Sequence, residues 1–368
     1  MKKKNLCKTL LKTMCIVLGI LILALLAYIV YLYASYYRIE DNQELVVEAP
    51  VDDTTTGAAA VLATDTEYSA VTYNIGFGAY LPDYSFFMDG GTSSWAESPE
   101  TVQYAINGAG ELVKSLDPDF ALIQEIDLDA TRSYHTDEYE MLRNLLPEYT
   151  TVFAQNYDSA FLFYPFTQPH GSSRAGLGLF SKYPVSSALR RSFPISTSFS
   201  KFFDLDRCYS VSRIPVDNGK ELVIFNLHMS AYGNSDAIRK GQIEMLCSDM
   251  QAEYKAGNYV LCGGDFNHDL KASEEDTESC ESWAFPFPRT ELPEHFAFCL
   301  DLLSTEEQAA LWNSARNADM EYVPGVTYTV TLDGFIISDN IECLSYENVN
   351  TGYSYSDHDP VKVDFVLK

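Results

Sequence analysis

Polar residues able to bind a metal ion or a phosphate oxygen stand at the ends of five apolar runs of this sequence. Four groups follow a run and the fifth precedes the last one: Asn74; Gln124 with Glu125; His228; Asp265 with Asn267; and Asp357 with His358. In open α/β folds, ligands bind outside the carboxyl ends of the strands. We therefore expect these side chains to converge in one cleft.

Each of these residues also has a structural explanation when taken alone. Asn and Asp after a strand usually belong to a turn, and glycines such as Gly263-Gly264 usually serve a tight turn. The pairs Gly76 with Gly78 and Gly176 with Gly178 lack the third glycine of a dinucleotide-binding site, so we interpret them as structural. Five such positions on one chain favour a functional cluster.

Strand and helix signals that could position these residues alternate along the chain. Residues 101–115 have helical periodicity and stop at Asp117-Pro118, and a second helical face from Ile243 to Tyr254 ends near Gly257. The runs predicted to be strands are 70–75, 119–123, 176–180, 222–227, 259–262 and 361–366. This alternation predicts a mixed α/β fold.

The composition divides the chain into three parts. Residues 1–38 are expected to form a short cytoplasmic stub and a transmembrane anchor. Residues 39–67 are expected to form an acidic linker outside the cytoplasm, because they are rich in Asp, Glu, Thr and Ala and lack periodicity. Residues 68–368 show no further break in composition and are predicted to form one large domain.

The N-terminal segment is predicted to anchor the chain in the cell membrane with a single span. No charged residue lies between Lys12 and Arg38, a stretch long enough for a helix to cross a hydrocarbon core of roughly 30 Å. Five lysines precede the apolar run and acids follow it, which places the N-terminus in the cytoplasm. A cleaved signal peptide is the alternative, but its apolar region would be shorter.

The charge of the remaining chain limits its partners. The net charge is −27, from 25 basic and 52 acidic residues. Six of the basic residues and none of the acids lie before residue 39, which leaves −33 for the rest. Such a domain repels polyanions, so we expect no stable nucleic-acid complex. A small phosphorylated substrate stays compatible, because a bound metal ion can reverse the field inside one cleft.

The motifs together resemble those of the endonuclease/exonuclease/phosphatase superfamily. The matching blocks, in the order found in that superfamily, are residues 71–74 (VTYN), 122–125 (LIQE), 176–184, 226–228 (NLH), 264–267 (GDFN), 332–335 (LDGF) and 356–361 (SDHDPV). The resemblance covers roughly residues 68–368. It implies a four-layer sandwich of two packed, mostly antiparallel mixed sheets flanked by helices.

The resemblance also implies a metal-dependent hydrolase of phosphoester bonds and a role for each site residue. Glu125 would be the principal Mg²⁺ ligand, with Asn74 and Asp357 beside it, and Mn²⁺ could substitute. Asp265 and Asn267 would orient the attacking water, and His228 would donate to a phosphate oxygen. His358, polarised by Asp333, would handle the proton. One departure is Gly334, where the family usually has a bulkier residue.

Several alternatives stay open at the level of sequence. The substrate could be a small or lipid-linked phosphoester, which the acidity favours, or external DNA or RNA cleaved by a surface nuclease. A catalytically inactive surface-binding protein is a third possibility, against which the intact motif set argues. Two loops, 80–95 and 271–294, could form the cleft rim or be solvated. Six cysteines after residue 200 could form disulfides or act as small buried hydrophobes.

Overall fold

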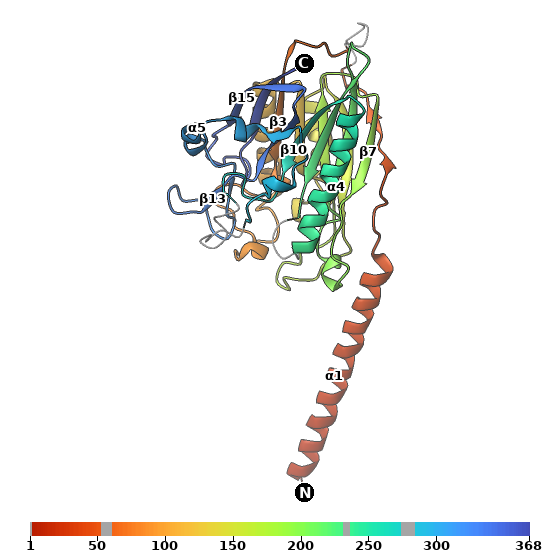
Figure 1. Ribbon diagram of the computed structural model, residues 1–368. Helices are drawn as coiled ribbons and strands as arrows, with labels where there is room; N and C mark the ends of the chain where they lie inside the picture. The colour runs from red at the N-terminus through yellow and green to blue at the C-terminus, as the bar shows by residue number, and fades with distance from the viewer. Residues whose placement is uncertain (1, 53–60, 231–235, 274–283) are drawn as a thin grey trace. The chain divides into compact units, whose positions relative to one another are not determined.

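The structure, a computed structural model, describes residues 2–52, 61–230, 236–273 and 284–368 (Figure 1). The chain forms two compact units, residues 1–38 and 39–368. The first unit is helix α1 (Lys2–Ser35). Within α1, Leu6–Ser35 is long and apolar enough to cross a membrane. This agrees with the anchor expected from sequence, by length and composition alone.

The second unit contains two seven-stranded mixed sheets. The first sheet has the order β1-β7-β8-β9-β10-β14-β11. Its strands are β1 (Gln43–Glu44), β7 (Ser187–Ser192), β8 (Cys208–Pro215), β9 (Glu221–His228), β10 (Tyr259–Asp265), β14 (Asp333–Ser338) and β11 (Phe296–Phe298). All pairings are antiparallel except that of β9 with β10.

The second sheet has the order β15-β16-β3-β4-β6-β5-β2. Its strands are β15 (Ile341–Asn348), β16 (Val361–Leu367), β3 (Glu67–Asn74), β4 (Phe120–Ala130), β6 (Ser173–Ser181), β5 (Thr150–Asp158) and β2 (Val47–Glu48). Only β3 and β4 run parallel. A separate two-stranded ladder joins β12 (Ala315–Arg316) to β13 (Thr329–Val330).

The sheets pack face to face, and the helices lie on their outer faces. The inner core joins side chains of both sheets, such as Leu122 and Leu179 of one and Phe225 and Leu261 of the other. The helices are α2 (Pro99–Leu116), α3 (Glu138–Leu145), α4 (Asp236–Lys255) and α5 (Thr305–Ala310), and the 3-10 turns are η1 (Gly76–Gly78), η2 (Phe87–Asp89), η3 (Thr131–Ser133), η4 (Phe199–Phe202), η6 (Arg289–Glu291) and η7 (Cys299–Leu302).

These helices complete a four-layer sandwich, as the sequence resemblance implied. Helix α2 buries one face against β3 and β4, with Ile106 and Val113 in the same core as Tyr73 and Ile123. Helix α4 buries Leu246 against the other sheet. Ser98 caps the first turn of α2, and Asp117 ends the helix in a left-handed conformation. The helix and strand signals in the sequence therefore correspond to real elements.

The segment expected to be a linker contributes to both sheets. Gln43 of β1 pairs with Arg190, and Val47 of β2 pairs with Val152. Leu62 is completely buried in the inner core. Residues 53–60 of the segment lie outside the described part of the chain. The two pairs of strand residues are too short to give a periodic signal, and their edge positions leave them partly exposed.

Candidate active site

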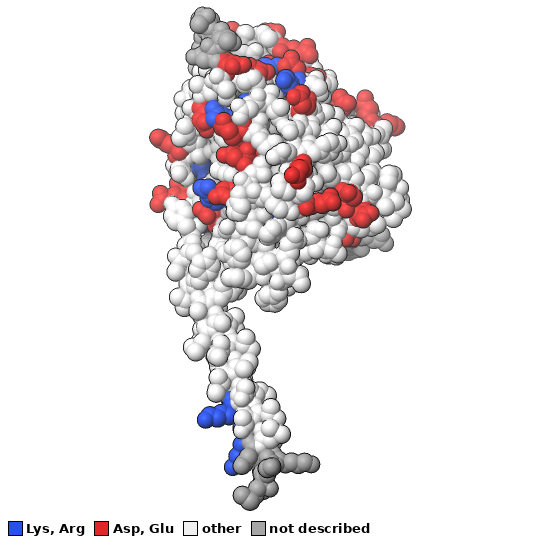
Figure 2. Space-filling model, turned by 180° about the vertical axis from the view of Figure 1, so that it is seen from behind, with Lys and Arg blue, Asp and Glu red and all other residues white. Residues whose placement is uncertain are grey.

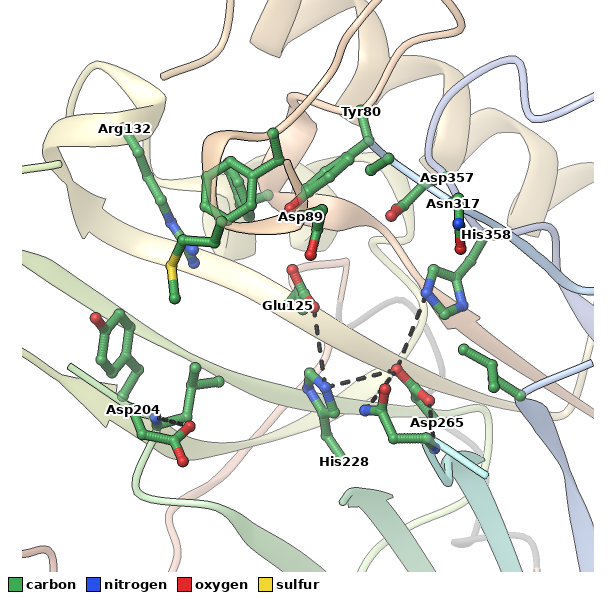
Figure 3. A pocket seen from close by; sticks show the side chains of 18 of the residues that line it. Tyr80, Asp89, Glu125, Arg132, Asp204, His228, Asp265, Asn317, Asp357 and His358 are labelled. Carbon is green, nitrogen blue, oxygen red and sulfur yellow. Dashed lines mark hydrogen bonds and ion pairs between the residues drawn. The ribbon is translucent and has the colours of Figure 1, made fainter. Parts of the chain in front are cut away.

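The strand registers bring the predicted site residues to one end of the two sheets. In the first sheet, Asp265 at the end of β10 pairs with His228 on one side and with Asp333 on the other. In the second sheet, Asn74 at the end of β3 pairs with Gln124 of β4. Because the sheets stack, Glu125 of the second sheet faces His228 and Asp265 of the first sheet across a single cleft, as Figure 3 shows.

Glu125 reaches the cleft because the backbone of β4 departs from regular strand geometry there. The register with β6 shifts between Ile123 and Ile126, and Glu125 has a positive φ of 57°. Gln124 points the other way, into the core, where it donates to Asn226 Oδ1 at 2.8 Å. The sequence placed these two neighbours together, whereas the structure gives only Glu125 to the cleft.

Asn74 links the carboxylates of the two sheets. Its amide nitrogen donates to Glu125 Oε1 at 3.2 Å and to Asp265 Oδ2 at 3.1 Å. Its amide oxygen accepts from the backbone N–H of Gly76 at 3.0 Å. Asn74 was predicted to be a metal ligand. In this arrangement its side-chain nitrogen, and not its oxygen, faces the carboxylates of Glu125 and Asp265.

Asn267 and Asp265 form a rigid pair on the opposite wall. Asn267 has a positive φ of 50° and donates its backbone N–H to Asp265 Oδ1 at 2.8 Å. Its side chain donates to the carbonyl of Met229 at 2.9 Å and to Asp265 Oδ2 at 3.3 Å. Burial raises the pKa of Asp265 to about 7, against the opposing effect of the nearby His358 charge.

His228 presents one ring nitrogen to the carboxylates. Its Nε2 lies 3.5 Å from Asp265 Oδ2 and 3.9 Å from Glu125 Oε1. Its Nδ1 is buried and has no hydrogen-bond partner among the described residues. Burial lowers the pKa of His228 well below its usual value, and the charge of Arg207 adds to the effect. A neutral ring with its proton on Nε2 fits these surroundings.

His358 and Asp333 form the imidazole–carboxylate pair that the motifs predicted. His358 Nδ1 lies 2.7 Å from Asp333 Oδ2, which also accepts from Ser314 Oγ at 2.8 Å. His358 Nε2 faces Asp265 Oδ2 at 4.0 Å. Burial alone would lower the pKa of His358, but the Asp333 charge and hydrogen bond raise it well above its usual value.

The glycine that departs from the family pattern has a packing explanation. A Cβ atom at Gly334 would come within 2.8 Å of Leu270 Cδ1. Leu270 is buried in the inner core. The small residue therefore follows from the tight fit of Leu270 against β14, and Asp333 keeps its position beside His358.

Asp357 completes the acidic side of the cleft. It follows Ser356, whose hydroxyl donates to the carbonyl of Asn74 at 2.8 Å and thereby ties this loop to β3. Burial raises the pKa of Asp357, while the charges of His358 and Arg316 partly offset that effect. Glu125 adds to the repulsion felt by both Asp357 and Asp265.

The donor set fits a hard divalent cation. Glu125, Asp265 and Asp357 are carboxylates that repel one another in one cleft, and a divalent cation would relieve that repulsion. A tighter group consists of Asp265, Asp333 and His358, whose ligand atoms lie within 4.8 Å of one another. Within that group, His358 and Asp333 already form a hydrogen bond with each other. The carboxylates around Glu125 therefore have more acceptor capacity left for a cation.

These residues line one part of a cavity of about 590 Å³, which extends beyond them. Residues that the sequence did not single out line this extension: Phe77, Tyr80, Phe86, Met88, Asp89, Arg132, Tyr157, His170, Phe203 and Arg207. Four of them belong to the loop 80–95, which the sequence suggested as a possible rim. Of the second suggested loop, residues 274–283 lie outside the described part of the chain.

Two charged residues of this extension differ in whether a side chain of opposite charge pairs with them. Arg132 donates from Nε and Nη2 to both carboxylate oxygens of Asp127, and its guanidinium lies 3.7 Å from the centre of the Phe77 ring. Asp89 has no such partner among the residues that the structure describes: burial, with the charges of Asp357 and Glu125, raises its pKa to about 7. No motif surrounds either residue, so only the three-dimensional structure reveals them.

The four remaining histidines divide into two buried and two exposed residues. His268 is buried and its Nδ1 lies 2.6 Å from the carbonyl of Phe266. His135 and His295 are exposed and pair with Asp129 and Asp339. His170 is buried against the rings of Phe86 and Phe87 and lines the cavity, and burial lowers its pKa to about 3.

Comparison with known families agrees with the motif order. Residues 71–303, more than half of the chain, match the model of the Endonuclease/Exonuclease/phosphatase family. A comparison with curated protein sequences finds no match.

Solved structures with the same fold share little sequence with this chain. An endonuclease/exonuclease/phosphatase from Beutenbergia cavernae is 16% identical with a TM-score of 0.54, covering 82% of this chain and 72% of its own. One from Bacteroides vulgatus is 16% identical with a TM-score of 0.53, covering 83% and 100%. ANGEL2, a 2′,3′-cyclic phosphatase, is 12% identical with a TM-score of 0.56, covering 82% and 96%. At these identities the likeness supports the fold alone.

Proposed function

The chain belongs to the Endonuclease/Exonuclease/phosphatase family, whose members hydrolyse phosphoester bonds with a divalent metal ion, and from this premise we propose a specific activity. The protein is a membrane-anchored, Mg²⁺-dependent phosphoester hydrolase with its catalytic domain outside the cytoplasm. Its substrate is a small or lipid-linked phosphoester. The observation that carries the proposal is the meeting of Glu125, Asp265, His228 and the His358–Asp333 pair in one cleft.

Glu125 and Asp357, with Asn74 beside them, would hold the metal ion. Mg²⁺ prefers hard oxygen ligands and keeps several waters, so a few carboxylates suffice, and Mn²⁺ could take its place. When bound, the ion would neutralise phosphate charge and lower the pKa of water. Asn74 would keep the Glu125 and Asp265 carboxylates in place through its two donated hydrogen bonds.

The other residues would position water and move protons. Asp265, fixed by Asn267, would orient the water that attacks phosphorus in line with the leaving oxygen. His228 would donate its Nε2–H to a phosphate oxygen. His358 would exchange a proton at Nε2, and Asp333 would fix its tautomer through Nδ1–H. No covalent protein intermediate is needed.

The charge of the domain favours a small or lipid-linked substrate over a long polyanion. The chain after residue 38 carries −33, and the arginines that line the cleft are few. Arg132 is already neutralised by Asp127. A nucleic-acid backbone would need a row of accessible Lys and Arg residues, which these observations do not provide.

The proposed location rests on α1 and on the charges around it. The five lysines before the apolar run would stay in the cytoplasm. Protease added to intact cells should then release the catalytic domain by cutting near Arg38, as seen by immunoblotting. A full-length chain that resists protease in intact cells, but not in lysed cells, would contradict the location.

The activity is tested by removing the principal metal ligand. Glu125→Ala should abolish hydrolysis of bis-p-nitrophenyl phosphate and of phospholipid substrates, because the cation loses its main carboxylate. EDTA should have the same effect, and added Mg²⁺ or Mn²⁺ should restore only the wild type. Glu111→Ala, on the exposed surface of α2, is the matched control and should be fully active. Activity that survives both EDTA and Glu125→Ala would overturn the proposal.

A further inference from the structure

Exposed aromatic side chains gather on two loops at the cleft end of the sheets. One loop joins β5 to β6 and the other joins β7 to β8. We call their exposed aromatic residues the aromatic rim: Phe163, Tyr164, Phe166, Phe199 and Phe203. Phe166 is 85% exposed and Tyr164 is 64% exposed, although burying such side chains is favourable in a folded protein. An exposed apolar group of this size indicates an interaction surface.

Most of these two loops is uncharged in a chain that is strongly acidic, and the charged residues of the β7–β8 loop, Lys201, Asp204, Asp206 and Arg207, all follow Ser200. No Asp, Glu, Lys or Arg occurs from Ser159 to Ser173 or from Ser192 to Ser200, although 21% of all residues are charged. On the face shown in Figure 2, charged side chains gather over the upper part of the catalytic domain and become sparse towards its lower end. In Figure 1, the loop with η4 lies at that lower end, and the C-terminus lies at the opposite end.

Strand registers place the rim beside the cleft. Ser192, the last residue of β7, pairs with Cys208, and the adjacent Tyr209 pairs with Leu227, next to His228. The β7–β8 loop therefore leaves the first sheet at the end where His228 lies. Phe203 of the rim lines the cleft, as does Tyr157 at the end of β5. Tyr164 packs against Phe87, with ring centres 5.9 Å apart.

The chain enters the catalytic domain at the same place. Ile39, the first residue of this unit, accepts a hydrogen bond from Ser192 Oγ at 3.1 Å, and Asp41 accepts from Ser192 N at 2.8 Å. Only three residues separate Ile39 from Ser35, the end of α1. An extended chain spans at most about 3.6 Å per residue, so this connection reaches roughly 15 Å.

The end of the apolar run also has the composition of a membrane interface. Five tyrosines occur between residues 28 and 37: Tyr28, Tyr31, Tyr33, Tyr36 and Tyr37. Tyrosine is enriched where a span meets the headgroups, because its ring is apolar and its hydroxyl is polar. If α1 spans the bilayer, the covalent connection therefore holds Ser192, and the rim loop that begins after it, close to the lipid headgroups.

We propose that the aromatic rim docks the catalytic domain on the surface of the bilayer that holds α1, with the cleft opening at the lipid headgroups. Burying Phe side chains in the bilayer interface stabilises the docked state, and the short tether removes most of the entropic cost of finding the surface. The net charge of −33 repels anionic lipid, so the docking is apolar and favours zwitterionic headgroups.

The docking surface has a consequence for the substrate, which rests on the proposed function. A cleft that opens at the headgroups would receive the phosphoester of a lipid from the same bilayer without extracting the lipid into water. The occupant of the cavity beside the metal-binding carboxylates would then be a lipid headgroup, with its apolar part left among the rim side chains.

The docking itself is tested without measuring catalysis. The full chain is placed in nanodiscs of phosphatidylcholine with brominated acyl chains, and tryptophan is introduced at the rim as Phe166→Trp or Phe199→Trp. Bromine quenches indole only at close range, so both variants should lose more fluorescence than wild type. Leu344→Trp, on the exposed face of β15 at the far end of the second sheet, is the matched control and should not.

Equal quenching at 166, 199 and 344, or none at any of them, would overturn the docking proposal. Both rim tryptophans could instead show no bromine quenching in nanodiscs and still be protected from quenching by aqueous iodide. That result would assign the rim to a contact with protein and would likewise overturn the docking proposal. Replacing a third of the lipid with phosphatidylglycerol should reduce the rim quenching, because the acidic domain is repelled.

The substrate consequence is tested with Phe166→Ser combined with Phe199→Ser, two exposed positions outside the cleft. The double variant should lose roughly tenfold or more in turnover of phospholipid in the same nanodisc, in line with the loss of two buried rings. It should turn over soluble bis-p-nitrophenyl phosphate at the wild-type rate. Equal losses on both substrates would contradict the consequence. Inactivity of the wild type on both would contradict the proposed function and leave the quenching result intact.

Discussion

Strand β14 carries an aspartate–histidine pair at each end, and the two pairs have the same bond length and different surroundings. At the cleft end, Asp333 Oδ2 lies 2.7 Å from His358 Nδ1. Just beyond the far end, Asp339 Oδ2 lies 2.7 Å from His295 Nδ1. The first pair is buried, whereas the side chains of the second are about half exposed.

The partners of the two pairs differ as well. At the far end, Tyr254 stacks on the His295 ring and donates its hydroxyl to Asp339 at 2.7 Å, so three side chains form a hydrogen-bonded group on the surface. At the cleft end, Asp333 Oδ1 is buried without a hydrogen-bond partner among the described residues, and His358 Nε2 faces Asp265. The aspartate–histidine hydrogen bond alone therefore does not separate a catalytic pair from a structural one. The two pairs differ instead in burial and in what the remaining ring nitrogen faces, and these two features support the proton-transfer role that we propose for the cleft-end pair.

The sharpest test of this comparison removes the two imidazoles separately. His358→Ala should lower kcat by roughly 10²–10⁴, the usual contribution of a general acid or base. His295→Ala should leave kcat unchanged. Steady-state kinetics on bis-p-nitrophenyl phosphate, with melting temperatures as a check on folding, would compare them. Wild-type turnover in His358→Ala would end the proposed role, and a matching loss in His295→Ala would remove the distinction between the two ends.

The motifs could predict the cleft-end pair because it lies within two distinctive blocks of sequence. Asp333 stands in LDGF and His358 in SDHDPV, and the register of β14 with β10 then brings Asp333 beside Asp265. The buried apolar runs likewise predicted the central strands, since their periodicity depends on local burial. Asp339 and His295 are the same residue types, yet no pattern distinguishes them from other surface residues.

Other parts of the site depend on long-range contacts that one sequence does not reveal. Asp89 acquires its raised pKa from burial and from charges distant in the sequence, Asp357 and Glu125. Glu125 points into the cleft only because the backbone of β4 takes a left-handed conformation after Gln124. The rim residues Phe166 and Phe199 lie 33 positions apart in the sequence. They flank one cleft because the loops that carry them leave two different sheets at the same end.

A second test asks whether the cleft-end residues act as a unit. Asp333→Asn keeps the shape of the side chain but removes the charge that fixes the His358 tautomer, so it should lose a large part of the His358→Ala effect, roughly 10–10³ in kcat. The double variant should be no slower than His358→Ala alone, because a carboxylate cannot orient an imidazole that is absent. Losses that multiply would show that Asp333 acts independently of His358. Asp339→Asn is the control and should keep full activity.

The smallest expected effect concerns stability at the far end of β14. Asp339→Asn should cost about 0.5 kcal/mol of unfolding free energy at pH 7, because the contacts of a half-exposed carboxylate are screened by solvent. Burial would raise the pKa of Asp339, but the bonds from Tyr254 and His295 outweigh it and lower that pKa. A carboxyl whose pKa is lower in the folded chain contributes its stability above the unfolded pKa of about 3.9, and loses it as the pH falls through the folded value.

Urea unfolding of wild type and variant at pH 7 and pH 3 should therefore show a small difference that nearly closes at the lower pH. A loss of several kcal/mol at pH 7 would mean that the far-end pair is energetically as strong as a buried one, and burial would no longer explain why only one end of β14 belongs to the site.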